Sequence, residues 1–188
     1  MKNLKVWAIG MVVIAMLAGC GSGGGGASSA GSAQSQAATV ASGQSGNYTA
    51  SFTLSNSLPV SPANVRGISF RFAVPEGVEP IIDSGGYAYG GRVQVAQSSI
   101  ALVIGTVQGV VAASYDQATR EVEVALVDGS GFTSFGSAFV KIQLQVSAPD
   151  AAGQSVILGA PAVEEVVDET GSSYPAGAFS VTQTGAFN

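Results

Sequence analysis

Apolar and polar residues alternate along three stretches of the chain, 67–74, 121–126 and 140–146. The apolar positions in these stretches are Ile68, Phe70, Phe72, Val74, Val122, Val124, Leu126, Val140, Ile142, Leu144 and Val146. The residues between them are mostly Ser, Arg, Glu, Lys, Gln and small residues. A period of two puts one set of side chains on each face of a strand. Each stretch is therefore predicted to be a half-buried β-strand.

Shorter runs of the same kind predict further strands and complete the fold prediction. These strands are expected at 48–54, 93–96, 99–104, 109–115, 155–158, 162–167 and 178–182. Residues that favour turns separate them, at 59–64, 75–77, 84–86, 128–131 and 149–153. No long stretch shows the 3.6-residue period of a helix. Many short strands without helices predict an all-β chain, folded as an antiparallel β-sandwich of about nine strands.

Three segments of this predicted sandwich resemble cohesin domains. They are 67–80 (GISFRFAVPEGVEP), 119–146 (TREVEVALVDGSGFTSFGSAFVKIQLQV) and 162–181 (AVEEVVDETGSSYPAGAFSV). The resemblance implies a jelly-roll sandwich of the cohesin-like or carbohydrate-binding-module-like kind. It also implies a non-catalytic module that binds a partner protein or a polysaccharide. A generic immunoglobulin-like sandwich is the alternative fold, and the chain contains no dockerin-like calcium repeat.

Composition excludes several classes of function. The chain has 7 Lys and Arg against 12 Asp and Glu, for a net charge of -5, with no His and one Cys. Without histidine there is no His-based catalytic triad and no His metal site. One cysteine forms neither an intramolecular disulfide nor a Cys-rich zinc site. An acidic chain with few cations lacks the clustered positive charge that nucleic-acid binding needs.

The N-terminal residues have the pattern of an export signal. Lys2 and Lys5 precede an apolar run, 6–18, that is shorter than the about 20 residues of a membrane-spanning helix. The run ends in Leu-Ala-Gly-Cys at 17–20, which resembles the lipobox of bacterial lipoproteins. The resemblance implies a signal peptide over 1–19, diacylglyceryl transfer to the Cys20 thiol, cleavage before Cys20, and acylation (palmitate included) of the new amino terminus. A plain secretory signal with a chance cysteine is the alternative.

A linker is expected between the acylated cysteine and the folded domain. Residues 21–46 contain no charge, aromatic or proline, and consist mainly of Gly, Ser and Ala. Such a segment cannot bury enough apolar surface to offset its ordering entropy. The predicted organisation is a signal peptide over 1–19, lipidated Cys and flexible linker over 20–46, and a β-sandwich domain over 47–188. Gly21, where an Asp would retain an enterobacterial lipoprotein at the inner membrane, favours the outer membrane.

Aromatic residues in loops are the candidate ligand-binding positions. Tyr87 and Tyr89 lie between paired glycines and would project to the same face of a strand, where rings can stack on a sugar or anchor a protein interface. Packing of both rings at the edge of the sandwich is the alternative. Tyr174 with Pro175, and Phe132 with Phe135, are weaker candidates of the same kind.

Carboxylates are the remaining groups with possible chemistry. A glycoside hydrolase needs two of them across a cleft, and Glu121 with Asp128 is one such candidate pair. No nucleophile elbow, phosphate loop or dinucleotide fingerprint is present, and we predict no enzyme, no catalytic residue and no cofactor. Calcium is the only plausible metal, because Glu164, Glu165, Asp168 and Glu169 are close in sequence and Ca²⁺ takes several oxygen ligands. Strand alternation would send Glu164 and Glu165 to opposite faces, so we predict a solvated loop and no metal.

Together these patterns predict a non-catalytic lipoprotein anchored to the bilayer through acylated Cys20. Its β-sandwich would bind a protein partner in the cell envelope, on the periplasmic or outer surface. A carbohydrate-binding lipoprotein is the second hypothesis and predicts a polysaccharide ligand at Tyr87 and Tyr89. A glycoside hydrolase is the third.

Overall fold

The computed structural model of the chain describes residues 45–58, 65–85, 91–103, 109–132, 135–147, 158–175 and 177–188. Its strands are β1 (Gly46–Asn56), β2 (Val65–Ala73), β3 (Val78–Pro80), β4 (Arg92–Gln94), β5 (Ile100–Leu102), β6 (Gly109–Asp116), β7 (Glu121–Phe132), β8 (Ala138–Val146), β9 (Ala162–Val167) and β10 (Phe179–Phe187). A single turn of 3-10 helix, η1 (Gln97–Ser99), precedes β5. The predicted all-β fold is confirmed.

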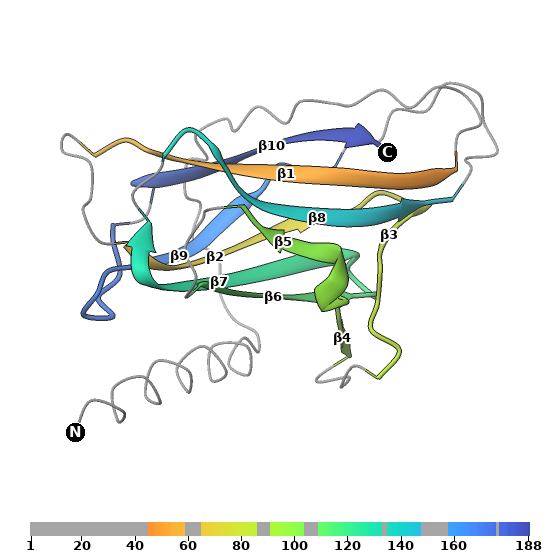
Figure 1. Cartoon of the computed structure of the whole chain (residues 1–188), viewed down its shortest axis with the longest axis horizontal. Coiled ribbons are helices and arrows are strands. Elements are labelled where there is room, and N and C mark those ends of the chain that lie inside the picture. The colour runs from red at the N-terminus through yellow and green to blue at the C-terminus, as the bar shows by residue number, and fades with distance from the viewer. Residues whose placement is uncertain are drawn as a thin grey trace. The chain divides into compact units, whose positions relative to one another are not determined.

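The strands form two antiparallel sheets packed face to face (Figure 1). The first sheet has the order β10-β1-β8, with the short strands β3 and β5 both paired to the far side of β8. The second sheet has the order β4-β6-β7-β2-β9. The described strands alternate between the two sheets at nearly every step along the chain, which produces the predicted sandwich.

The inward side chains of both sheets make one hydrophobic core. In β1 the residues Tyr48, Ala50, Phe52 and Leu54 are buried, whereas the intervening Thr and Ser residues face outward. Phe52 contacts Phe70 and Phe72 of β2 in the opposite sheet, with ring centroids 5.0 and 4.8 Å apart. Burial of side chains of this size contributes about 1.5–3 kcal/mol each, so the alternating pattern holds the two sheets together.

The structure confirms one predicted turn and contradicts another. At 75–77 the chain turns as predicted, with Gly77 at a φ of 78° and Val78 N–H donating to the Pro75 carbonyl at 3.2 Å. At 128–131 the predicted turn is wrong, because these residues belong to β7. Val65 pairs with Phe132 and Gly67 with Val127, so four residues of β7 bulge out opposite Arg66 alone. The Asp128 carboxylate accepts the Ser130 N–H at 2.8 Å and stabilises the bulge.

Strand β3 was not expected from the sequence, since three residues are too few to show a period. The strand expected at 155–158 falls mostly outside the described residues, and Leu158 itself is buried in the core. Residues 1–44, which include the expected signal peptide and nearly all of the linker, also lie outside them. Within the described part of the chain, no helix is long and apolar enough to cross a membrane.

Candidate interaction surface

The outer face of the second sheet carries a row of aliphatic residues. Pairing places Val110 of β6 opposite Val127 of β7, Val127 opposite Gly67 of β2, and Gly67 opposite Val167 of β9. These four residues, here called the valine row, cross four neighbouring strands. The next row of paired residues, Ala112, Ala125, Ser69 and Glu165, is made of small side chains except at its end.

Solvent reaches the valine row unevenly. Val110 lies on the side of β6 that faces away from the core and is 69% exposed. Among the described positions, the other exposed large apolar residue is Val103, at 42%. Val127 and Val167 are half-buried. A Cβ on Gly67 would lie 2.7 Å from Cγ2 of Val167, so the missing side chain makes room for that valine to lean across the strand. The result is a low apolar strip.

Ionic residues form a band on the far side of this row of small residues. Arg71 of β2 lies 3.9 Å from Glu121 of β7 and 3.4 Å from Glu164 of β9, each measured between guanidinium nitrogen and carboxylate oxygen. Arg92 of β4 pairs with Glu123 of β7. These five residues, the charged band, contain two cations and three carboxylates. The face is therefore apolar at one end and acidic at the other.

Asp116, at the end of β6, adds a further negative charge next to the band. Its Oδ1 accepts the backbone N–H groups of Ala118 and Thr119 at 2.9 and 3.3 Å. Hydrogen bonds from Thr119 and Ala118 favour the ionised carboxylate and lower the pKa of Asp116. The carboxylate thus stays charged and fixes the turn between β6 and β7.

The expected alternation of Glu164 and Glu165 is wrong because β9 contains a bulge. Phe70 pairs with Val163 and Ser69 with Glu165, so Glu164 is an extra residue in the ladder. Glu164 contacts Arg71 on the outer face, and Glu165 lies opposite Ser69 on the same face. A one-residue insertion shifts the side-chain period, which the sequence does not reveal.

The four candidate calcium ligands are each engaged by protein groups. Asp168 Oδ1 accepts hydrogen bonds from Thr170 N–H, Thr170 Oγ1 and Ser172 N–H, at 2.7, 2.7 and 3.0 Å. Those bonds lower the pKa of Asp168, the largest effect coming from the Thr170 hydroxyl. Ser173 donates to Glu165 at 2.5 Å, and Glu169 faces Arg66 at 3.8 Å. Within the described ranges, no three acidic, His or Cys residues gather where they would hold a metal.

The candidate hydrolase pair is not brought together. Glu121 projects to the outer face of β7, whereas Asp128 is 1% exposed and follows the inward positions Val124 and Leu126. Seven residue steps along the strand place them about 23 Å apart, well beyond the roughly 5–9.5 Å of paired catalytic carboxylates. This pair therefore has no glycosidase geometry.

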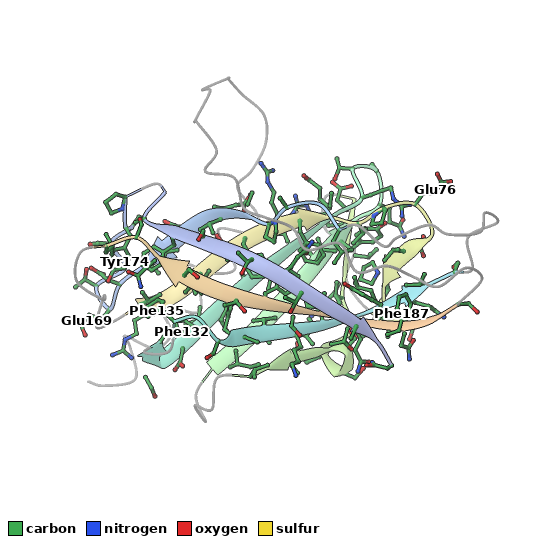
Figure 2. All side chains as sticks on the ribbon, turned by 90° about the horizontal axis from the view of Figure 1, so that it is seen from above. Glu76, Phe132, Phe135, Glu169, Tyr174 and Phe187 are labelled. Atoms are coloured by element: carbon green, nitrogen blue, oxygen red, sulfur yellow. The ribbon has the colours of Figure 1, made fainter. Side chains whose placement is uncertain are left out.

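The weaker aromatic candidates pack against the sandwich. Phe132 is buried, and Phe135 and Tyr174 both contact Phe179 of β10, with ring centroids 6.2 and 5.2 Å apart. Figure 2 shows Phe132, Phe135 and Tyr174 at one end of the molecule, opposite the end with Phe187. Burial raises the pKa of Tyr174, and the charges of Asp168 and Glu169 act in the same direction. These rings close the core and do not form a stacking platform.

Tyr87, Tyr89 and Cys20 lie outside the described residues, so their predicted roles stay predictions. The valine row was missed by sequence reasoning. The signal for it was present in GVVAASYD at 109–116, because Val111, Ala113 and Tyr115 occupy the inward positions. Val110 and Ala112 then stand where an exposed strand normally has polar residues.

Comparison with known proteins identifies no family. No family model matches the chain, and no curated protein matches its sequence. Among solved structures, the fold is similar to a non-cellulosomal cohesin from the hyperthermophilic archaeon Archaeoglobus fulgidus, at 13% sequence identity and a TM-score of 0.45. The similarity covers 78% of this chain and 86% of that chain. A cohesin domain is thus one structural neighbour of this β-sandwich.

Proposed function

We propose that this protein is a lipid-anchored protein of the bacterial cell envelope, whose β-sandwich binds a partner protein through the outer face of the β4-β6-β7-β2-β9 sheet. The observation that carries the proposal is the valine row, with Val110 69% exposed at the apolar end of this sheet face. Exposed aliphatic side chains gain free energy when another surface excludes water from them. The proposal assigns no catalysis.

The surroundings of the valine row support a protein partner. Protein interfaces combine an apolar centre that has few charges with a polar rim. Here the centre is the valine row with Ala112 and Ala125, and the rim is the charged band. Three carboxylates against two arginines make this rim acidic, so we expect the partner to present basic groups beside an apolar patch. Complementary charge would set the orientation of the complex.

The test compares two matched valines. The full chain with Cys20→Ser is attached through its N-terminus to a solid support and exposed to detergent-solubilised envelope extract, and bound proteins are identified by mass spectrometry. Val110→Ser removes the most exposed residue of the row. Val103→Ser makes the same change at the other exposed valine, which follows β5 in the opposite sheet. We expect a partner protein that the parent chain and the Val103→Ser variant capture in equal amounts. The Val110→Ser variant should capture at least tenfold less of it.

Two results would contradict this assignment of the binding face. One is a partner bound equally by all three chains, which would move the interface elsewhere. The other is binding of an insoluble polysaccharide that is lost on joint substitution of Tyr87 and Tyr89 by Ala. That second result would favour the carbohydrate-binding hypothesis.

The lipid anchor is tested separately in cells. The parent chain is expected to incorporate a labelled fatty acid and to fractionate with membranes. Cys20→Ser is expected to lose the label entirely, because the thiol is the acceptor of the diacylglyceryl group that the lipobox implies. A Cys20→Ser chain that is still acylated and membrane-bound would refute the anchor while leaving the binding face untouched.

A further inference from the structure

Gly67 is the member of the valine row without a side chain, although its backbone does not require a glycine. Its φ lies outside the left-handed region, in contrast to those of Gly77 and Gly131. A glycine inside a strand weakens that strand and often marks a place where another group approaches closely. At Gly67 the approaching group is the side chain of Val167 on the neighbouring strand β9. The space over Gly67 is therefore used by Val167.

Backbone pairing fixes the strands at this contact, so only a side chain can adjust there. Gly67 pairs with Val127 on one side and with Val167 on the other. Val167 in turn pairs with Ser173 on its other side. A Cβ at residue 67 would lie 2.7 Å from Cγ2 of Val167, closer than two such carbons normally come, but at an ordinary 3.7 Å from the Leu126 carbonyl oxygen. A methyl group there would thus displace the Val167 side chain and leave the ladder in place.

The lean of Val167 determines which strands carry the apolar surface. β9 is the last strand in the order β4-β6-β7-β2-β9, yet Cγ2 of Val167 lies next to the position that a side chain of β2 would occupy. Apolar atoms therefore cover the three middle strands β6, β7 and β2, which lie side by side in Figure 1. With the small residues of the next row they form one patch about 10 Å wide. This middle patch consists of Val110, Val127, Gly67 with the Val167 methyl group beside it, Ala112, Ala125 and Ser69.

We propose that Gly67 is a positioning residue of the binding face, because it lets Val167 complete the middle patch on which the partner packs. The inference rests on the binding face proposed above and adds where on that face the contact is centred. Residues that contribute most to binding cluster near the centre of an interface, where water is excluded. A Val167 side chain turned away from β2 would leave a gap beside Val127, and water would enter it. The partner therefore places its apolar residues over β7 and β2, and its basic groups over the charged band.

This packing predicts that substitutions at positions 67 and 167 compensate for each other. In the parent chain Gly67→Ala turns the Val167 side chain away from β2. In a chain with Val167→Ala the space over β2 is empty, and the methyl group from Gly67→Ala fills it without a clash. The same substitution therefore has a different effect in the two chains, as residues in contact do. A cost that came only from replacing a strand glycine would be equal in both.

The first experiment measures this coupling without any partner. Thermal unfolding is recorded for the full chain with Cys20→Ser, and for the same chain with Gly67→Ala, with Val167→Ala and with both. We expect Gly67→Ala to raise the unfolding midpoint by at least about 2 °C more in the Val167→Ala chain than in the parent. Gly46→Ala is the control, because a Cβ there meets nothing within 4 Å. Its effect should be equal in both chains.

The second experiment measures binding by the same four chains, on the support and with the envelope extract used for Val110→Ser. The readout is the amount of the protein that the parent chain captures and that Val110→Ser loses. We expect Gly67→Ala to capture at least fivefold less of it. The chain with both substitutions should capture at least threefold more than Gly67→Ala alone, because a methyl group again covers β2. Gly46→Ala should capture as much as the parent.

The outcomes separate this inference from the proposed function. Loss of capture on Val110→Ser without loss on Gly67→Ala overturns the role of Gly67 and leaves the binding face in place. Capture that neither substitution reduces, or no capture by the parent chain, contradicts the binding face and the role of Gly67 with it. Equal midpoint shifts from Gly67→Ala in the two chains overturn the packing itself. Circular dichroism of each variant shows whether the β-sandwich is intact.

Discussion

Arg120 holds a backbone conformation that residues with a Cβ seldom adopt, at a φ of 56° in the turn between β6 and β7. Its side chain explains why the residue is not glycine. Nε donates to the Val74 carbonyl at 3.2 Å, and Nη2 donates to the carbonyls of Pro75 and Val78, the latter at 3.0 Å. Val74 N–H returns a bond to the Arg120 carbonyl at 2.9 Å. One side chain thus fastens the β6–β7 turn to the turn between β2 and β3.

Substitutions of Arg120 separate the side-chain contribution from the backbone strain. Arg120→Ala should lower the free energy of unfolding by about 2–3 kcal/mol, because it removes the charged donors and keeps the unfavourable φ. Arg120→Gly loses the same donors but relieves the strain, so it should be about 1 kcal/mol more stable than Arg120→Ala. Urea unfolding of the three chains gives both numbers. Equal stability of the Ala and Gly variants would contradict the strained conformation.

At the scale of elements, the alternation of apolar and polar residues predicted where strands form. It did not predict where bulges interrupt them. The runs around Phe70, Val124 and Ile142 are strands because one face of each is buried in the core. The bulges at Glu164 and at 128–131 were hidden, since an extra residue in a ladder depends on how the neighbouring strand pairs. Gly and Asp at 128–131 favour a turn locally, but the pairing of Asp128 with Gly109 and of Phe132 with Val65 keeps the segment in β7.

The candidate surface was beyond the sequence for the same reason. Val110, Val127 and Val167 are far apart along the chain, and only the pairing of β6, β7, β2 and β9 aligns them in one row. Features that depend on the residues of one strand could be predicted from the sequence. Features that depend on how neighbouring strands pair required the structure.

The seating of β10 on β1 depends on Gly185. A Cβ at this position would lie 1.8 Å from the Tyr48 hydroxyl oxygen and 2.1 Å from Cζ, so the tyrosine ring occupies the space above the glycine. The same ring contacts Phe187 edge-on at 5.3 Å between centroids. Tyr48 is 2% exposed and cannot move aside without leaving the core. The pair therefore fixes the position of the terminal strand.

Gly185→Ala should destabilise the protein by about 3 kcal/mol through overpacking against Tyr48. Gly46→Ala in β1 is the matched control, because a Cβ there meets nothing within 4 Å. Its free energy of unfolding should stay within about 0.5 kcal/mol of the parent. Thermal and urea unfolding of both variants measure the difference. Similar losses from the two alanines would mean that the general cost of replacing a strand glycine, and not the Tyr48 contact, sets the effect.

For the whole molecule, the titratable groups predict a free energy of unfolding that is constant over a wide pH range and falls at both the acid and the alkaline end. On the acid side, the pKa values of Asp116 and Asp168 are lowered from 3.8 by hydrogen bonds. Their stabilisation is complete above pH 3.8 and is lost as the pH falls through the lower folded values. On the alkaline side, burial raises the pKa values of Tyr48, Tyr115 and Tyr174 above 10.0. Their neutral forms stabilise the fold below pH 10, and this contribution is lost as the pH rises through the folded values.

The chain has no histidine, so no side chain of that type titrates between these edges. Urea unfolding of the full chain from pH 5 to 9 should therefore give a free energy of unfolding constant within about 0.5 kcal/mol. Above pH 10 the free energy should fall by up to about 1.4 kcal/mol per pH unit for each tyrosine that stays neutral only in the folded state. Tyr48→Phe should make that alkaline slope shallower and leave the acid edge unchanged. An unchanged slope would show that Tyr48 ionises in place, which its burial against Gly185 and Phe187 of β10 argues against.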